Sequence, residues 1–305
     1  MGHDHDHGVR DAAVTHRRPL TVVLAISAVI LVAEVVGGLL SGSLALLADA
    51  GHMLADVAGL SLALVAATLS LRPATSERTW GYKRAEVIAA AAQAGLLLAV
   101  GVAILVEGVR RLLEPPELET GVMFWFALVA LLGNLASVLV MSRIQRGNLN
   151  TRAASLEVLT DALGAFAVVV ASVLIAAFGW LRADAVISIA IALLIVPRTV
   201  RLLRESVDVL LEATPRGVDL EDVRTHLLGV THVLAVHDLH ATQVATDLPV
   251  LTAHVVVEDA CFHDGHLPQL LDEMQSCLSD HFDVEHSTFQ FEPPGHGTHE
   301  HAAHA

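Results

Sequence analysis

Cysteine is scarce in this chain, and its scarcity excludes two kinds of protein. Only Cys261 and Cys277 occur among the 305 residues, and both lie in the polar C-terminal third. Two cysteines cannot form a disulfide framework or a four-cysteine zinc site. We therefore expect this third of the chain to lie in the reducing cytosol. The first 15 residues also lack the basic segment and short apolar core of a secretory signal peptide, so the first apolar stretch should remain in the mature protein.

Basic residues are almost missing from the same C-terminal third. From Glu205 onward the sequence holds 18 of the 33 acidic residues and 13 of the 18 histidines, but only two basic residues, Arg216 and Arg224. A segment this acidic is a poor partner for nucleic acid and attracts cations. Acidity alone also fits a surface tuned for solubility, and the concentration of histidine is what favours metal binding.

Polar residues are sparse in the rest of the chain. The composition is 54% apolar and the mean hydropathy is +0.60, which is too high for an ordinary soluble domain. Long apolar stretches predict membrane-spanning helices at about 20–40, 44–71, 86–109, 121–142, 154–178 and 183–203. Each is near the roughly 20 residues that cross the hydrocarbon core of a lipid bilayer. We therefore expect a six-helix, all-α membrane domain over residues 17–204.

Arginine and lysine between the expected spans predict how the membrane domain is oriented. Twelve of these residues fall on one side of the six spans, and three, Arg110, Arg111 and Arg182, fall on the other. The positive-inside rule therefore places both termini in the cytoplasm. We expect an integral protein of the cell membrane.

A small mixed domain follows the last span. Segments with helical or alternating periodicity lie, in order, at 219–229, 232–242, 250–258, 265–281 and 288–292. The order αββαβ predicts two helices packed on one antiparallel sheet, an α+β domain over 205–293. The two ends of the chain, 1–16 and 294–305, are rich in histidine, and their composition predicts disordered segments that bind metal loosely.

Polar residues inside two of the expected spans share one helix face. The second span holds Asp49, His52 and Asp56 at spacings of three and four residues. The fifth span holds Glu157 and Asp161, four residues apart. Such spacings bring side chains onto one face of a helix. If the two helices face each other, they offer a set of four ligands that suits tetrahedral coordination of a transition metal: His52, Asp56, Glu157 and Asp161.

The energy of burying charge favours a functional site here. A charged carboxylate in the middle of a membrane helix costs about 2.5–3.5 kcal/mol, so three cost roughly 8–10 kcal/mol. Whole-protein stabilities are only about 5–15 kcal/mol, so these groups must face one another, water or a bound cation. Interhelical hydrogen bonding accounts for a lone Gln93 or Asn134 but not for this cluster. Glu34 and Glu107 are each expected to be the lone charged residue at their depth in the membrane. Each is expected either to serve a proton path or simply to pair with another group. Asp184 is expected to be an interfacial charge.

Four segments together resemble a known family. They are 41–56, which contains the polar residues of the second span, 78–87, 148–164, which contains those of the fifth, and the His-Asp-Leu-His segment 237–240. Over about residues 17–293 the sequence is similar to the cation diffusion facilitator family of zinc exporters. The resemblance implies six transmembrane helices, a cytosolic ferredoxin-like domain, a homodimer, and export of Zn²⁺ as substrate, driven by inward flow of protons. It implies a transporter and not an enzyme.

Carried over onto this chain, the resemblance implies a transport site formed by His52, Asp56, Glu157 and Asp161, with Asp49 behind it or at its entrance. Many zinc exporters of the family have histidine at the position of Glu157. A site with one nitrogen and three oxygen ligands still suits Zn²⁺ but should exclude Mn²⁺, Fe²⁺ or Co²⁺ less well.

In the cytosolic domain the resemblance implies a regulatory Zn²⁺ site. Its ligands are expected among His240, His254, His286 and Glu292, with His237, Cys261, His263 and His266 as nearby candidates. The resemblance also implies a charge pair between Arg84 and the acidic segment 208–212 that braces the dimer.

Rival functions remain open at this stage. An exporter of Mn²⁺, Fe²⁺ or Co²⁺ fits the oxygen-rich site, and a membrane-bound metal sensor or buffer fits the histidine-rich ends. A membrane-embedded metalloenzyme is disfavoured, because His52 is the only histidine within the expected spans and no His-Glu-x-x-His motif accompanies it. An exporter of organic cations is disfavoured because aromatic residues make up only 4% of the chain.

Overall fold

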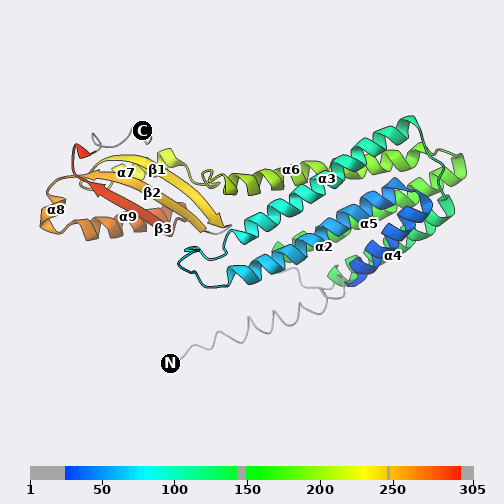
Figure 1. The fold of residues 1–305 in the computed structure, drawn as a ribbon, viewed down its shortest axis with the longest axis horizontal. Coiled ribbons are helices and arrows are strands. Elements are labelled where there is room, and N and C mark those ends of the chain that lie inside the picture. The colour runs from blue at the N-terminus through cyan, green and yellow to red at the C-terminus, as the bar shows by residue number, and fades with distance from the viewer. Residues whose placement is uncertain (1–24, 143–148, 246–247, 297–305) are drawn as a thin grey trace, which may run out of the picture. The chain divides into compact units, whose positions relative to one another are not determined.

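The computed structural model describes residues 25–142, 149–245 and 248–296 (Figure 1). The histidine-rich segment expected at 1–16 and most of the one expected at 294–305 lie outside the described residues.

The chain divides into two compact units. The first takes residues up to Ser61 together with Ala92–Arg201, and the second takes Leu62–Ala91 together with residues from Leu202 onward. Three long helices therefore contribute residues to both units.

Five helices of the described chain are long and apolar enough to cross a membrane. They are α2 (Leu44–Ser70), α3 (Ala85–Leu113), α4 (Thr120–Ser142), α5 (Leu149–Phe178) and α6 (Arg182–Leu210). A shorter apolar helix, Ala25–Ser41, precedes them. Helix α6 continues beyond the expected end at 203, because the end of an apolar stretch does not itself end a helix. Glu212, with φ 59°, takes the left-handed conformation that follows its last turn.

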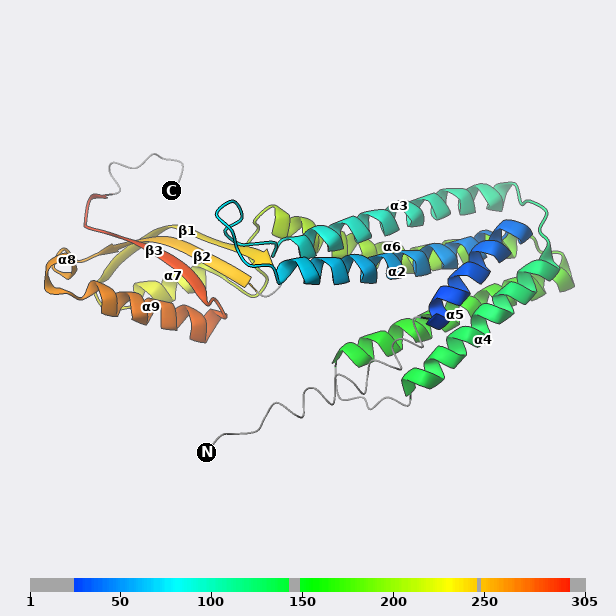
Figure 2. The ribbon, with the colours of Figure 1, turned by 60° about the horizontal axis from the view of Figure 1, so that its bottom comes forward.

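Small residues form much of the core of the first unit. The fully buried alanines of this core are Ala45, Ala48, Ala127, Ala171 and Ala192. Figure 2 shows α4 beside α5, and these two helices pack closely along their length. A Cβ atom added to Gly37, on the N-terminal helix, would lie 2.5 Å from the side chain of Phe126 on α4. Helices inside a bilayer associate through such close backbone approach, because lipid supplies no hydrophobic drive between them.

Asp184, in the first turn of α6, caps the start of α2. Its carboxylate accepts hydrogen bonds from the Ser43 hydroxyl at 2.6 Å and from the backbone N–H groups of Leu44 and Ala45 at 2.9 and 3.2 Å. A negative charge at a helix N-terminus satisfies unpaired N–H groups and interacts favourably with the helix dipole. The side chain is only 1% exposed, so the expectation of an interfacial charge was wrong for Asp184.

Glu107 of α3 has charged neighbours, so it is not the lone charged residue at its depth. It pairs with Arg111 at 3.0 Å and with Arg110 at 3.8 Å. Arg111 also donates to the carbonyl oxygen of Gly42 at 2.6 Å and lies 3.8 Å from Asp184. The alternative of simple pairing is therefore confirmed for Glu107, and one ionic network joins α3, α6 and the turn before α2.

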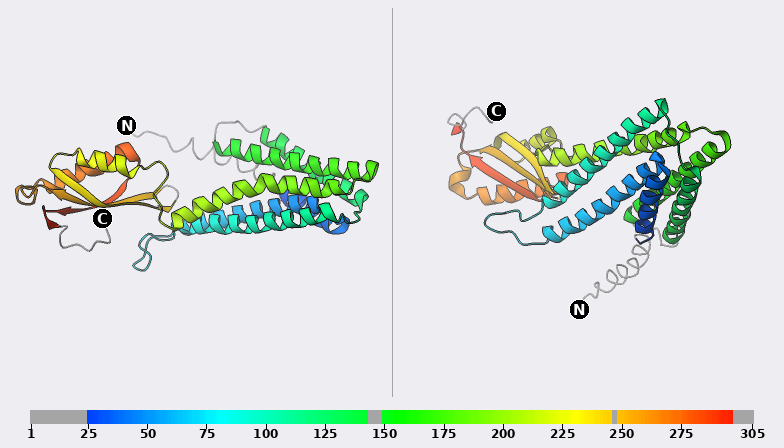
Figure 3. Two further views of the ribbon diagram at one scale, coloured as in Figure 1. Left: turned by 90° about the horizontal axis from the view of Figure 1, so that it is seen from above. Right: turned by 45° about the vertical axis from the view of Figure 1, so that its right-hand side comes forward.

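The second unit contains a three-stranded sheet with helices on one face (Figure 3). Its elements are α7 (Leu220–Leu228), β1 (Val233–Ala245), β2 (Leu248–Val257), α8 (Cys261–Asp264), α9 (Leu267–Phe282) and β3 (His286–Glu292). Strand β2 lies in the middle, antiparallel to β1 and parallel to β3. The expected order αββαβ is observed, with the four-residue α8 added.

The expectation of a fully antiparallel sheet was wrong at β3. A tight connection would have returned the chain antiparallel to β2, but α9 crosses over between the two strands and brings β3 in parallel, as crossover helices do. The core under the sheet comes from residues spaced three or four apart on the helices, Val223 and Leu227 on α7 and Leu270, Met274 and Leu278 on α9.

Replacing Asp184 with alanine should lower the stability of the first unit. The change orphans buried donors at the start of α2, and loss of an N-cap costs about 0.5–2 kcal/mol, with about 1–3 kcal/mol more for an unsatisfied buried group. We expect a lower unfolding temperature for purified protein in detergent, with Asp184→Asn between alanine and wild type. The control is Thr199→Ala on α6, whose buried hydroxyl donates only to Ile195 of its own helix. Equal unfolding temperatures for Asp184→Ala and Thr199→Ala would contradict the capping role.

Candidate metal sites

The expected intramembrane site is partly visible in the described residues. Across the α2–α5 boundary, Nε2 of His52 lies 3.7 Å from Oδ1 of Asp161, and the two side chains are only 13% and 12% exposed. The helix periodicity therefore does bring a ligand of the second span against one of the fifth. Asp56 and Glu157 lie in α2 and α5, one helical turn from these two residues, but their side chains are outside the described part of the chain. The complete four-ligand set stays a prediction.

Asp49 forms a second buried pair, and its partner is Glu34. Asp49 is 3% exposed and Glu34 is 0% exposed. The two carboxyl groups are neighbours, and within the described residues neither oxygen of Glu34 nor Oδ2 of Asp49 has a hydrogen-bond partner. The expectation that Glu34 is alone at its depth was therefore wrong.

The sequence contained a signal for this pair that periodicity within one helix does not reveal. Glu34 lies seven residues before Ser41 and Asp49 lies six residues after Ser43, so the two are nearly equidistant from the short turn between the N-terminal helix and α2. Residues equally far from a tight helical turn lie at the same depth.

A glycine of α5 brings Asp49 close to the helix that carries Asp161. A Cβ atom at Gly164 would lie 3.1 Å from Oδ1 of Asp49. Gly164 follows Asp161 by three residues, so both face the same side of α5. Asp49 thus lies beside the His52–Asp161 pair.

In the second unit, His237, His254 and Glu292 form one cluster with three potential metal ligands. One ligand atom from each lies within 4.8 Å of the others. Nε2 of His237 is 3.1 Å from Oε2 of Glu292, Nδ1 of His254 is 2.8 Å from Oε1 of Glu292, and the two ring centres are 5.2 Å apart. The register produces this cluster, because His237 on β1 pairs with His254 on β2, and His254 pairs with Gln290, two residues before Glu292 on β3.

Glu292 is prepared to act as an anionic ligand. Burial raises the pKa of this carboxyl, but hydrogen bonds from Gln290 and His237 outweigh burial and hold the pKa below its ordinary value. The side chain is 1% exposed and faces two imidazoles. A buried carboxylate with imidazole neighbours is a favourable ligand set for Zn²⁺.

The other expected cytosolic ligands lie elsewhere in the structure. The His240 side chain is 60% exposed and pairs with Asp238 at 2.8 Å. The ring of His286 packs edge-on against Trp80, with centroids 4.9 Å apart. His263 lies on α8, 77% exposed and 4.0 Å from Asp259. The structure does not bring these three histidines into the described cluster around Glu292.

Sequence reasoning missed Asp238, which orients the cluster. Asp238, at φ 48°, contacts His254 at 3.4 Å from the strand that carries His237. It lies within the His-Asp-Leu-His segment 237–240, of which only the histidines were expected to bind metal. Gln290 also supports the cluster, because it donates to Glu292 at 2.8 Å.

Two further features of the second unit bear on the expectations. Arg84 pairs with Glu212 at 2.7 Å, so the implied contact between Arg84 and the acidic segment 208–212 is present within one chain.

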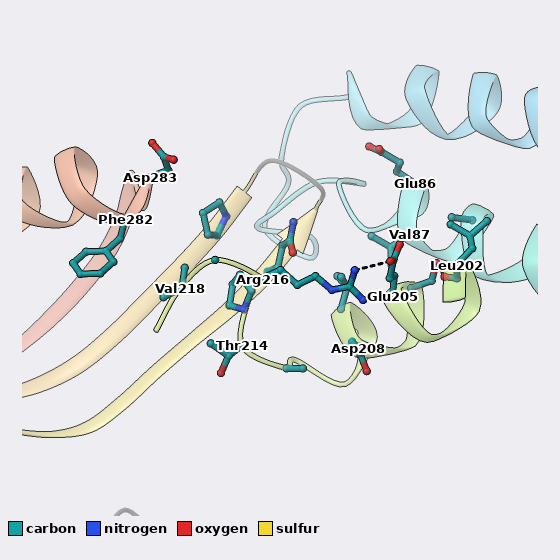
Figure 4. Close-up of a pocket in the computed structure, with 18 residues that line it drawn as sticks. Glu86, Val87, Leu202, Glu205, Asp208, Thr214, Arg216, Val218, Phe282 and Asp283 are labelled. Atoms are coloured by element: carbon teal, nitrogen blue, oxygen red, sulfur yellow. Dashed lines mark hydrogen bonds and ion pairs between the residues drawn. The ribbon is translucent and has the colours of Figure 1, made fainter. Parts of the chain in front are cut away.

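A cavity of about 730 Å³ lies between the ends of α3 and α6 in this unit and β1–β2. Figure 4 shows Arg216 reaching from its wall to Glu205, at 2.5 Å, with Glu86, Asp208 and Asp283 also on the lining.

Two family comparisons cover almost the whole chain. Residues 20–211 match the cation efflux transmembrane domain, and residues 215–294 match the cytoplasmic domain of cation efflux proteins.

Individual relatives agree with these matches. The metal cation efflux system protein CzcD of Cupriavidus metallidurans is 40% identical over 291 residues, covering 95% of this chain and 90% of that protein. The zinc transporter ZitB of Escherichia coli is 38% identical and covers 97% and 95%. The cadmium, cobalt and zinc/H⁺–K⁺ antiporter of Bacillus subtilis is 33% identical and covers 97% and 93%.

A solved structure, the metal-bound C-terminal domain of the CzcD transporter from Cupriavidus metallidurans, matches with 36% identity and a TM-score of 0.22, covering 25% of this chain and 99% of that one. The long apolar helices and the two family matches lead to one conclusion. The chain is an integral membrane protein that belongs to the cation efflux family, the cation diffusion facilitators.

Proposed function

We propose that this protein exports Zn²⁺ from the cytoplasm across the cell membrane in exchange for protons, working as a homodimer with six spans and both termini in the cytoplasm. The observation that carries the proposal is the approach of His52 to Asp161 between α2 and α5, two ligand types of Zn²⁺ facing each other in apolar helices. The names of the relatives support the same substrate class: a metal cation efflux system protein, a zinc transporter, and a cadmium, cobalt and zinc/H⁺–K⁺ antiporter.

Competition between metal and protons couples the two flows. Coordination needs a neutral imidazole and ionised carboxylates, so Zn²⁺ and protons compete for the same groups. In the state that faces the cytoplasm, a near-neutral pH favours metal. After the helices reorient toward an acidic exterior, protons displace the ion and return with the empty site. The neighbouring carboxyl groups of Glu34 and Asp49 lie beside the site and add two further groups that can bind protons.

The cytosolic domain supplies a second, regulatory binding step in this proposal. His237, His254 and Glu292 bind Zn²⁺, and the family of the C-terminal domain supports a dimer in which bound metal offsets repulsion between two acidic surfaces. Export then rises when cytosolic Zn²⁺ is high enough to occupy these ligands.

Replacing Asp161 with alanine should abolish transport while the protein remains folded. The variant removes a carboxylate that faces His52, so neither metal nor counter-proton is held there. Zn²⁺ flux is measured in proteoliposomes with an imposed pH gradient and a trapped zinc dye. The matched control is Thr160→Ala, since Thr160 is exposed and donates only to Leu156 of its own helix. If the Asp161→Ala variant transports Zn²⁺ as fast as the wild type, the site is ruled out. If transport by the wild type does not depend on the pH gradient, proton coupling is ruled out.

Replacing Glu157 with histidine should narrow the metal selectivity. The change converts an oxygen ligand to a nitrogen ligand, and hard or borderline ions such as Mn²⁺ and Fe²⁺ lose more from it than Zn²⁺ does. We expect Zn²⁺ flux to persist and any Mn²⁺ or Fe²⁺ flux to fall in the same proteoliposomes, each metal assayed separately. Unchanged ratios between the metals would show that Glu157 does not contact the transported ion.

Replacing Glu292 with glutamine should weaken Zn²⁺ binding in the cytosolic domain. Losing even an indirect partner of a metal costs about 10–100-fold in affinity, and a direct anionic ligand costs at least as much. Full-length protein in detergent is titrated with Zn²⁺, and protection of His237 and His254 from diethyl pyrocarbonate is read by mass spectrometry. Glu285→Gln, at an exposed carboxylate in the turn before β3, is the control. Equal titration midpoints for the two variants would remove Glu292 from the ligand set.

A further inference from the structure

A second group of histidines and carboxylates lies away from the cluster around Glu292. His232 lies in the turn before β1, and Glu258 follows β2 directly. Asp264 ends α8, and His266 precedes α9. Three connections of the second unit thus bring these four side chains together. Along the strands the group is five residues from His237 and four from His254, roughly 15 Å at about 3.4 Å per residue. The two groups are therefore separate.

The two imidazoles of this group have the spacing that one metal ion requires. The ring centres of His232 and His266 are 5.4 Å apart, and their planes are tilted by 54°. Imidazole nitrogens bind Zn²⁺ at about 2.0–2.1 Å, so a tetrahedral ion places two ring centres roughly 5 Å apart. The rings of His237 and His254 have nearly the same separation, 5.2 Å.

A carboxylate orients each imidazole. Nδ1 of His232 pairs with Oε2 of Glu258 at 2.9 Å, and Nδ1 of His266 pairs with Oδ1 of Asp264 at 2.8 Å. Histidines that bind metal usually engage a carboxylate or carbonyl through the other ring nitrogen, which fixes the tautomer and raises the basicity of the ligand atom. Here both contacts use Nδ1, so Nε2 is the ring nitrogen of each histidine that is available as a metal ligand.

The backbone holds both histidines in place. His232 has φ 71°, a conformation that non-glycine residues rarely adopt, and its carbonyl accepts from the N–H of Glu258 at 3.1 Å. Glu258 thereby fixes both the main chain and the ring of His232. Asp264 does the same for His266, because its carboxylate also accepts from the His266 N–H at 3.1 Å. The ligands are therefore largely arranged before any metal binds.

The surroundings favour a cation bound by nitrogen. Residues 258–266 carry three carboxylates and no lysine or arginine. The Asp264 carboxylate lies against both the ring and the backbone N–H of His266, so its negative charge is held beside that imidazole. Burial, together with Asp264 and Glu258, raises the pKa of the Cys261 thiol.

We propose that His232 and His266 form a second metal site, which binds a divalent ion of the Zn²⁺, Co²⁺, Ni²⁺ or Cu²⁺ class through their Nε2 atoms. Glu258 and Asp264 are positioning residues, and water fills the remaining coordination positions. A bound ion fastens the α8–α9 connection to the end of the sheet. The half-exposed rings allow the ion to exchange with the cytosol, unlike an ion held by buried Glu292.

Another histidine pair in the same domain provides a matched control. The rings of His226 and His281 are 5.2 Å apart, close to the separation of the proposed pair. Nδ1 of His226, however, contacts the backbone carbonyl of Asp222, and its ring packs against Phe282. This pair therefore has a similar spacing, with a backbone carbonyl in place of a carboxylate against His226.

Zn²⁺ titration of the full-length protein in detergent tests the site. Metal is first removed with a chelator, and a His254→Ala background weakens the neighbouring cluster. Diethyl pyrocarbonate labelling with mass spectrometry then reports each histidine separately, so the terminal histidines do not interfere. We expect Zn²⁺, but not Mg²⁺, to protect His232 and His266. The protection of His266 should vanish in His232→Ala, and Glu258→Gln should raise the midpoint by about 10–100-fold. His226→Ala should change nothing.

Three results would overturn the site. In the first, Zn²⁺ does not change the labelling of His232 and His266. In the second, Zn²⁺ protects His226 and His281 as strongly as it protects His232 and His266. The third is protection of His266 that persists in His232→Ala, because the two residues must share one ion. None of these outcomes depends on transport, so they leave the proposed export of Zn²⁺ to its own flux assay.

Discussion

Charge buried among apolar helices is the constraint on which the first unit depends. An ionised group in hydrocarbon costs several kcal/mol unless a partner meets it. In the described residues, four acidic side chains of this unit meet partners from another part of the sequence or from their own helix turn: Asp184 with the start of α2, Glu107 with Arg111, Glu34 with Asp49, and Asp161 with His52. The three pairs that join different helices fix which helix faces meet, which the nearly uniform apolar surfaces around them do not specify.

The four pairs differ in whether the partner is permanent. Asp184 is held by backbone N–H groups and a hydroxyl, and Glu107 by guanidinium groups, none of which can leave. Asp161 faces an imidazole and Glu34 faces a carboxyl, so their charge balance depends on protons or on a bound cation. The permanent pairs lie near one end of the helices, at the connections before α2 and α6. The exchangeable pairs lie further along the helices from these connections.

Sequence predicted what a single element determines and missed what two elements determine together. Apolar length predicted the helices, and three- and four-residue spacing predicted that His52 and Asp161 share a face with their neighbours. Glu34 appeared alone because its partner lies across a turn, and β3 appeared antiparallel because strand direction depends on the crossover of α9. His286 is an expected ligand that packs instead against Trp80, a contact between segments over 200 residues apart that no local pattern encodes.

In the cytosolic domain, titratable side chains also lie next to one another, but at a surface exposed to water. His237 and His254 lie on β1 and β2, whereas His232 and His266 lie in connections beyond the strands. In both of these pairs the imidazoles contact carboxylates that no lysine or arginine neutralises in the described structure. A domain with this charge balance repels a second copy of itself, and each bound divalent ion reduces that repulsion. In the two proposed sites, we expect the buried carboxylate of Glu292 to retain an ion, and the exposed carboxylates near His232 and His266 to allow exchange. With this difference, one domain would respond to metal over a wider concentration range than a single site does.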